Sequence, residues 1–142
     1  MTAFVLDASV TMRWLLASTN NQHQRYARDV LGTLENTEAL VPELWHLEVT
    51  NVLLSYEQDG ELTAIDSERF LQQLEALPIR TDASTTSQAF THTMTIARSH
   101  RLTSYDAAYI ELAVREGLPI ASLDKQMRKC AASLEIPLYL EQ

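Results

Sequence analysis

The sequence predicts an α/β protein, a three-layer α/β/α sandwich around a mostly parallel sheet of about five strands. Short apolar runs alternate with longer segments of helical period along the 142 residues, and this order gives a parallel sheet covered on both faces. Only 3 glycines are present, which disfavours the tight hairpins of an all-β barrel. No repeat, low-complexity segment or linker interrupts the pattern. We therefore expect a single domain over residues 1–142.

The apolar runs predict strands, and the periodic segments between them predict helices. Pro42 is expected to stop the second strand, and the dipeptide at 59–60 to end the third helix. Thr63 or Asp66 is a possible cap for the next helix, and Gly117 followed by Pro119 is a stop signal. The expected strands cover residues 4–6, 40–41, 78–80, 120–123 and 138–140. The expected helices cover residues 9–17, 22–34, 44–57, 64–77, 87–99, 105–116 and 125–134.

Composition excludes several classes of site. The glycines are too far apart in sequence for a phosphate-binding glycine loop. The single Cys130 permits no internal disulfide and no CxxC zinc site, and four isolated histidines supply no HExxH motif. A net charge of −8 argues against binding nucleic acid by general surface charge, although bound cations reverse the sign locally. We expect no membrane span and no secretory signal peptide, and hence a cytoplasmic protein.

Two aspartates stand where strands end. Asp7 follows the apolar run 4–6, and Asp124 follows the run 120–123. In parallel sheets, ligands bind beyond the carboxyl ends of the strands, so the pair indicates a site. The alternative is that each aspartate is only the N-cap of the next helix.

Glu48 is expected to point inward. With about 100° per residue, it shares its side of the helix 44–57 with Leu44, Trp45, Val52 and two polar residues, Asn51 and Ser55. A carboxylate in a buried stripe needs a partner, because an unpaired buried charge costs several kcal/mol. That partner is either a buried arginine such as Arg13 or a metal ion.

Asp106 is expected in the same orientation. It shares one face of the helix 105–116 with Tyr109, Ile110 and Ala113, while Glu111 and Arg115 point away. The alternative is a capping box, in which Thr103 and Asp106 exchange hydrogen bonds at the helix start.

Other polar residues flank these four acids. Hydroxyls that support the acids, or only cap and turn the chain, are Ser9, Thr103 and Ser122. Basic residues form two short clusters that either contact a phosphate backbone or are simply a solvated helix surface: Arg98, His100 and Arg101, and Lys125, Arg128 and Lys129.

Four segments occur in order along the chain: LDASV at 6–10, LEVTNVL at 47–53, LTSYDAAY at 102–109 and SLD at 122–124. Together they resemble the PIN-domain family, most closely the VapC-like toxins of type II toxin–antitoxin systems. The likeness extends from about residue 3 to residue 140. In that family the last motif is often Thr-x-Asp, and here Ser122 keeps the hydroxyl.

The resemblance implies a Mg²⁺- or Mn²⁺-dependent endoribonuclease whose metal-site and catalytic acids are Asp7, Glu48, Asp106 and Asp124. Carboxylates without histidine or thiolate suit these hard ions. Ser9, Asn51 and Ser122 would support the site. The resemblance also implies RNA as substrate, a homodimer, and an antitoxin protein lying on the helices at 22–34, 44–57 and 64–77.

Two further interpretations come from other classes of protein. One is a catalytically silent interaction module whose acids only cap helices. The other is a phosphatase of the haloacid-dehalogenase type, suggested by Asp7 after a first strand, although that chemistry wants a second acid where this chain has Ser9.

Overall fold

Four parallel strands form the centre of the fold, described here from a computed structural model for residues 3–141. The predicted domain 1–142 extends beyond the described residues at both ends. The strands are β1 (Phe4–Leu6), β2 (Ala39–Pro42), β3 (Ile79–Asp82) and β4 (Ile120–Ala121). They lie in the order β3-β2-β1-β4, and each neighbouring pair is parallel. The parallel α/β architecture is confirmed, with four strands instead of about five.

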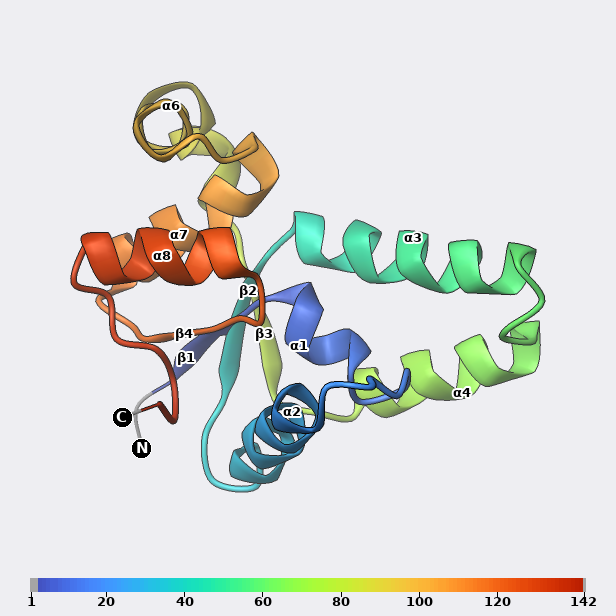
Figure 1. The fold of residues 1–142 in the computed structure, drawn as a ribbon. Helices are drawn as coiled ribbons and strands as arrows, with labels where there is room; N and C mark the ends of the chain where they lie inside the picture. Colours follow the sequence, from blue (N-terminus) through green and yellow to red (C-terminus); the bar gives the residue numbers. More distant parts are fainter. Residues whose placement is uncertain (1–2, 142) are drawn as a thin grey trace.

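Helices cover both faces of this sheet (Figure 1). The helical elements are α1 (Ala8–Met12), α2 (Asn21–Thr33), α3 (Leu44–Gln58), α4 (Ala64–Glu75), α5 (Thr85–Gln88), η1 (Ala89–Thr93), α6 (Met94–His100), α7 (Ser104–Glu116) and α8 (Lys125–Ser133). Figure 1 shows α7 and α8 on one face of the sheet and α1 and α2 on the other, while α3 and α4 form an arm that extends away from it. None of the helices in residues 3–141 is long and apolar enough to cross a membrane.

The predicted fifth strand at 138–140 is a single bridge. Leu138 pairs in parallel with Ile120, whose N–H and C=O bond Pro137 O and Tyr139 N at 3.0 and 2.9 Å. Left-handed backbone at Glu135 and Leu140 bounds this segment, and a proline has no N–H to extend the ladder. Pairing therefore stops after one residue.

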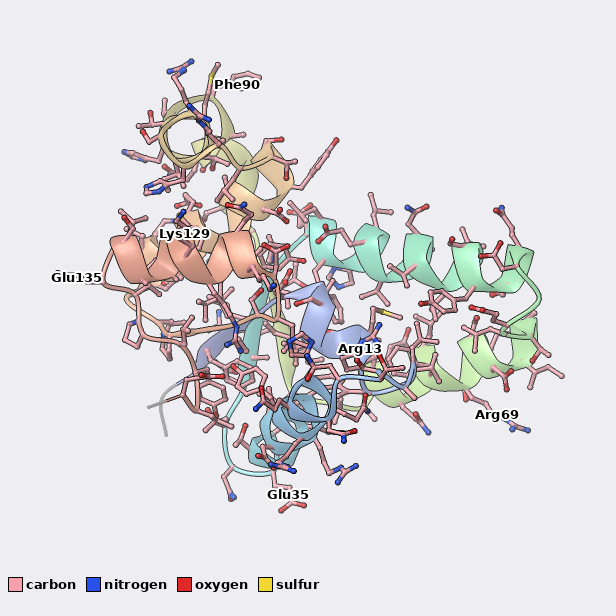
Figure 2. The ribbon with its side chains drawn as sticks, viewed as in Figure 1. Arg13, Glu35, Arg69, Phe90, Lys129 and Glu135 are labelled. Atoms are coloured by element: carbon pink, nitrogen blue, oxygen red, sulfur yellow. The ribbon has the colours of Figure 1, made fainter. Side chains whose placement is uncertain are left out.

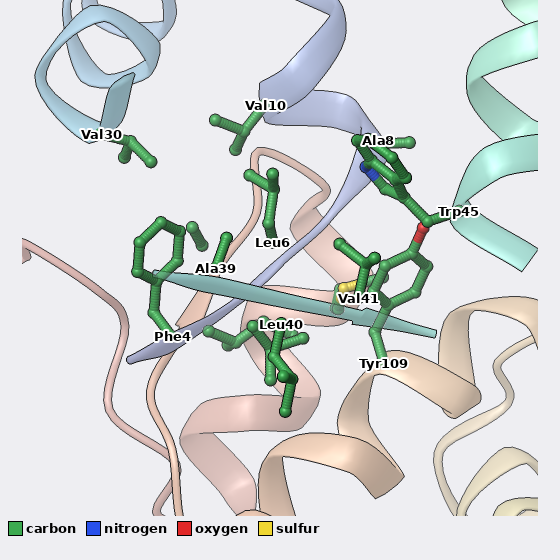
Figure 3. Close-up of a cluster of buried hydrophobic side chains, with 14 of the residues drawn as sticks. Phe4, Leu6, Ala8, Val10, Val30, Ala39, Leu40, Val41, Trp45 and Tyr109 are labelled. Atoms are coloured by element: carbon green, nitrogen blue, oxygen red, sulfur yellow. The ribbon is translucent and has the colours of Figure 1, made fainter. Parts of the chain in front are cut away.

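The core lies between the sheet and its helices because β1, β2 and β4 consist of buried, apolar residues. Phe4, Val5 and Leu6 are fully buried, as expected for a central strand covered on both faces. Figure 3 shows Phe4 and Leu6 among side chains of α2, α1 and β2. Phe4 also stacks on Tyr139 with ring centroids 4.0 Å apart, which fastens the C-terminal segment to β1.

Two helix predictions need correction. The helix expected over 9–17 ends as α-helix at Met12 and continues as turns. The helix expected over 87–99 is divided into α5, the π-helical turn η1 and α6. A π-turn inserts an extra residue into the helical repeat, which a search for period 3.6 does not detect.

Candidate metal centre

The carboxyl ends of β1 and β4 lie side by side, followed by Asp7 and Asp124. The Asp7 N–H donates to Ala121 O at 3.0 Å. From β1 the chain enters α1 on one face of the sheet, and from β4 it enters α8 on the other (Figure 1). This reversal opens the crevice in which open α/β sheets bind ligands. The strand order thus brings residues from both ends of the chain to one crevice.

Asp7 is the most buried acid of the crevice, with a side chain 5% exposed. Its Oδ2 accepts hydrogen bonds from the hydroxyls of Ser9 at 2.6 Å and Ser122 at 2.8 Å. Burial raises the pKa of Asp7 from 3.8 to about 6; the two hydroxyls oppose the rise, and the charges of Glu48 and Asp106 add to it. Asp7 is therefore fixed in place by two neutral donors, but its charge is uncompensated.

The helix-cap interpretation of Asp7 is wrong. Asp7 occupies the N-cap position of α1, yet its side chain makes no capping hydrogen bond. Both hydroxyls bond Oδ2, and no donor among residues 3–141 bonds Oδ1. One carboxylate oxygen is thus available for a ligand. The predicted support by Ser9 and Ser122 agrees with these contacts, and Ser9 Oγ also accepts from the Leu123 N–H at 2.9 Å.

Glu48 reaches the crevice from the second turn of α3. It is not at the centre of a buried stripe as expected, because the buried residues of α3 are Trp45, Val49 and Leu53 and Glu48 is half-buried beside them. The α3–α4 arm projects from the sheet, so only one narrow face of α3 is covered. Accordingly Asn51 and Ser55 are exposed. Among the described residues, no side-chain hydrogen bond of Asn51 supports the role predicted for it.

A buried tyrosine holds Glu48. The Tyr109 hydroxyl donates to Glu48 Oε1 at 2.5 Å, and burial raises the pKa of Glu48, with the Tyr109 bond lowering it and the Asp106 charge raising it. In Figure 3 the Tyr109 side chain points from α7 toward Ala8 and Trp45. Tyr109 was predicted on the Asp106 face, but its bond to a residue on another helix left no sequence signal.

Asp106 lies in the first turn of α7, and Asp124 is the N-cap residue of α8, on the opposite face of the sheet. Burial raises the pKa of Asp106, and the charge of Asp124 raises it further, while the Thr103 hydroxyl lowers it. Thr103 caps α7 by accepting from the Asp106 N–H at 3.1 Å, but the reciprocal bond of a capping box is absent from the bonds described for α7. Asp124 does cap its helix, since Oδ1 accepts from the Met127 N–H at 2.8 Å. The cap interpretation therefore fits Asp124 alone.

Within residues 3–141 no cation pairs with any of these four acids. Arg13, the arginine considered for Glu48, instead bonds Ala17 O at 3.5 Å. The side chains as they lie also form no group of three that could share one ion within the described chain. An ion bound by three of them requires rotation of half-buried side chains such as Glu48 and Asp106. The donor set, carboxylate and hydroxyl oxygens only, suits Mg²⁺ or Mn²⁺.

An open hollow of about 350 Å³ adjoins the acids, and Ser9, Glu48 and Asp124 line it together with Arg13 and His23. Substrate-sized groups can therefore approach the acids from solvent. The crevice is not sealed inside the fold.

A buried ion-pair network lies at the other end of α7. Arg115 bonds Glu111 at 2.7 Å and Asp82, the last residue of β3, at 2.9 Å. Glu111 was expected to point away from the Asp106 face and does so, but it is only 3% exposed, because η1 and α6 cover that side. The spacing of Glu111 and Arg115 indicates an i, i+4 pair; the third partner is visible only in the fold.

Comparison with known proteins places the fold. A family model described as PIN domain matches residues 4–132. Among solved structures, PAE2754 from Pyrobaculum aerophilum is 17% identical with a TM-score of 0.66, over 91% of this chain and 84% of that one. The structure of VapBC2 from Rickettsia felis bound to a promoter DNA fragment is 14% identical with a TM-score of 0.60, over 90% of this chain and 92% of that one. FitAcB from Neisseria gonorrhoeae is 16% identical with a TM-score of 0.59, over 96% of each chain. Comparison with proteins of curated function finds no match.

Proposed function

The chain belongs to the PIN-domain family, and from this premise we propose that it is a divalent-metal-dependent endoribonuclease. Proteins of this family are typically nucleases that use a divalent metal. The predicted phosphatase of the haloacid-dehalogenase type finds no support, since Ser9 occupies the second acid position and bonds Asp7.

One observation carries the proposal: burial and the charges of neighbouring acids raise the pKa values of Asp7, Glu48 and Asp106, which come from separate elements, and no described cation compensates these charges. The Asp7 carboxyl responds to Glu48 and Asp106, and Asp106 responds to Asp124. A purely structural acid cluster would be expected to pair with arginine or lysine, because unpaired buried charge is costly. Uncompensated acids at a sheet crevice indicate a cation-binding, functional site.

The four acids have two proposed roles: three of them bind the metal, and Glu48 binds the attacking water. Asp7, through its free Oδ1, would bind the ion with Asp106 and Asp124, while Ser9 and Ser122 keep Asp7 oriented. A bound divalent ion makes water nucleophilic and stabilises charge on the phosphate. Glu48, oriented by Tyr109 through one oxygen, can accept the proton of the attacking water with the other, and its raised pKa favours that role.

The expected reaction is hydrolysis that leaves a 5′-phosphate and a 3′-hydroxyl, since attack by water does not use the ribose 2′-hydroxyl. Purified protein incubated with RNA should cut it in Mg²⁺ or Mn²⁺ but not in EDTA. Asp7→Asn should abolish cutting, whereas Asp29→Asn, at an exposed position of α2, should not. Equal cutting by the wild type and Asp7→Asn, or equal cutting with and without EDTA, would mean a contaminant and defeat the proposal.

We further propose that the protein is the toxin of a toxin–antitoxin pair. An apolar hollow of about 310 Å³ between α3 and α4, lined by Trp45, Val49 and Leu74 among others, suits an apolar segment of an antitoxin. Co-expression with a small basic protein encoded beside it should give a stable complex and suppress cleavage. A protein that is harmless when overexpressed and forms no complex with that neighbour would contradict this assignment.

The predicted homodimer remains a prediction. Leu47 and Tyr105, which are 73% and 63% exposed, line a hollow beside Glu48 and are candidates for its interface. Light scattering on Leu47→Glu against the wild type tests it: the variant should be monomeric. A wild type that is itself monomeric at all concentrations would exclude the dimer.

A further inference from the structure

A further hollow, of about 410 Å³, lies between the end of α6 and α8 and gathers basic side chains. His100, Arg101 and Lys129 line it, and we call it the basic hollow. These residues belong to the two short basic clusters of the sequence, which the fold brings together. Figure 2 shows Lys129 on the side of α8 that faces α6.

The composition of the basic hollow is unusual for this protein. The chain carries 19 acidic and 11 basic residues, yet no Asp or Glu of residues 3–141 lines this hollow. The remaining lining includes neutral groups that can donate hydrogen bonds, from Ser99, Gln126 and Ser133. By contrast, the hollows beside α3 and α1 contain Glu48.

The cations of the basic hollow have no acidic partner in the described chain. The ion pairs of the described residues use Arg80, Arg115 and Arg128, so Arg101 and Lys129 keep their charge free. Arg101 also adopts left-handed backbone, with φ 54, a conformation that costs energy for a residue with a side chain. Converging, unpaired cations with neutral donors between them fit an anion with several oxygens, and phosphate is such an anion.

The basic hollow is close in sequence to the candidate metal centre, along α8 and across the short link between α6 and α7. Lys129 follows Asp124 by five residues of α8, or about 8 Å of helix axis. Arg101 similarly precedes Asp106 across the Thr103 cap. A nucleic-acid strand cut at the acids therefore reaches the basic hollow within a few nucleotides.

We propose that the basic hollow binds backbone phosphates of the RNA substrate, on nucleotides neighbouring the cleaved bond. This inference rests on the proposed function. It also explains how a protein of net charge −8 holds a polyanion: one basic surface beside a metal-neutralised centre is enough, without a basic protein overall.

The test is RNA binding in an Asp106→Asn background, which prevents cutting. Fluorescence anisotropy with a fluorescein-labelled single-stranded RNA compares Arg101→Asn/Lys129→Gln with the control Arg25→Gln/Arg69→Gln, which removes equal charge from exposed positions elsewhere. Asparagine is chosen at 101 because it tolerates left-handed backbone. The basic-hollow variant should weaken binding by about tenfold and reduce the slope of log Kd against log salt by about 1.4, since each single-strand phosphate contact contributes about 0.7.

Cleavage separates this inference from the proposed nuclease. In otherwise wild-type protein, the basic-hollow variant should raise KM and leave kcat unchanged. If it binds RNA with the affinity and salt slope of the control while Asp7→Asn still abolishes cleavage, only this inference is overturned. If the wild type cuts no RNA but the basic-hollow variant still loses RNA binding, the nuclease proposal fails, and only the assignment of phosphate binding to the basic hollow stands.

Two other anions test whether the basic hollow is selective for the RNA backbone. Inorganic phosphate should show no saturable binding in calorimetry, because one phosphate satisfies only part of the hollow. Polyglutamate should displace the RNA far less well than unlabelled RNA of equal length. Saturable phosphate binding that the basic-hollow variant loses while RNA binding is unchanged, or displacement by polyglutamate as strong as by RNA, would overturn the assignment.

Discussion

Two helices of this protein begin with the same local sequence, Thr-x-x-Asp, and use the aspartate differently. At the start of α4, Thr63 and Asp66 form a complete capping box: Asp66 N–H donates to the Thr63 hydroxyl at 3.1 Å, and Thr63 N–H donates to Asp66 Oδ2 at 3.0 Å. At the start of α7, Thr103 provides the first of these bonds, and the second is not formed.

The pKa directions follow the difference. Hydrogen bonds from the Thr63 backbone and side chain hold the pKa of Asp66 below its usual value. Burial and the charge of Asp124 raise the pKa of Asp106. An identical motif thus stabilises one helix and places an unfavourable charge on the other. Where an aspartate in a capping position forgoes its cap, a ligand outside the helix is the simplest reason.

The largest effect that tests this comparison is on catalysis. Asp106→Asn should reduce RNA cleavage by at least about 100-fold, because under the proposed function it removes a carboxylate that binds the metal. Asp66→Asn should leave cleavage within about twofold of wild type. Single-turnover rates in Mn²⁺ measure both. Comparable losses in the two variants would erase the functional distinction between the helices.

Acid–base behaviour extends the comparison to Asp7. Because the folded-state pKa of Asp7 is about 6 against 3.8 normally, rising pH ionises the unfolded chain first and destabilises the fold between about pH 4 and 6. Above that range the cost is on the order of 3 kcal/mol. In EDTA, urea unfolding of the wild type should show this loss between about pH 4 and pH 7.5, and Asp7→Asn should lack it. A pH-independent difference between the two proteins would contradict the assigned pKa.

Stabilisation by metal should also distinguish Asp66 from Asp106, by a free energy similar to that expected for Asp7. Saturating Mn²⁺, at about 100 times its Kd, stabilises a folded protein by about 2.7 kcal/mol. We expect the melting temperature of the wild type and of Asp66→Asn to rise by several degrees, and that of Asp106→Asn to rise much less. A Mn²⁺ shift that survives in Asp106→Asn would remove this residue from the metal centre.

The smallest expected effect is on metal-free stability, where the two substitutions should have opposite signs. Asp66→Asn should lower the melting temperature near pH 7, because the amide accepts the Thr63 N–H more weakly than a carboxylate does and loses the favourable helix-terminal charge. Asp106→Asn should leave it unchanged or raise it, since it relieves repulsion. Calorimetry in EDTA checks both, and a fall with Asp106→Asn matching that of Asp66→Asn would show that Asp106 is a structural cap.

Sequence patterns predicted what depends on neighbouring residues. The apolar strands β1, β2 and β4 and the Gly117 stop of α7 follow from local rules and are confirmed. The inward direction of Glu48 was only half right, because helical period assumes a helix covered along its length and α3 projects in an arm. The π-turn η1 was missed for a different reason, because its extra residue breaks the helical period.

Contacts between distant segments had no such signal. Tyr109 and Glu48 come from different helices, and Arg115 joins Glu111 to the end of β3. The resemblance to the PIN family supplied the four acids as a set, whereas the residues themselves suggested Asp7 and Asp124 as a pair and Glu48 and Asp106 one at a time. The two basic clusters were visible in the sequence, but that they face one hollow was not.

The Arg115 bridge has a mechanical consequence for the helix that carries Asp106. The C-terminal half of α7 is anchored to the sheet by the ion pair between Arg115 and Asp82, whereas its first turn carries the Asp106 charge, which is repelled by neighbouring acids. The electrostatic repulsion is thus confined to the first turn of α7, and the anchored half keeps the rest of the helix backbone in place. Amide protons of that turn should consequently exchange with solvent sooner than those around Arg115 and slow down once a dication arrives.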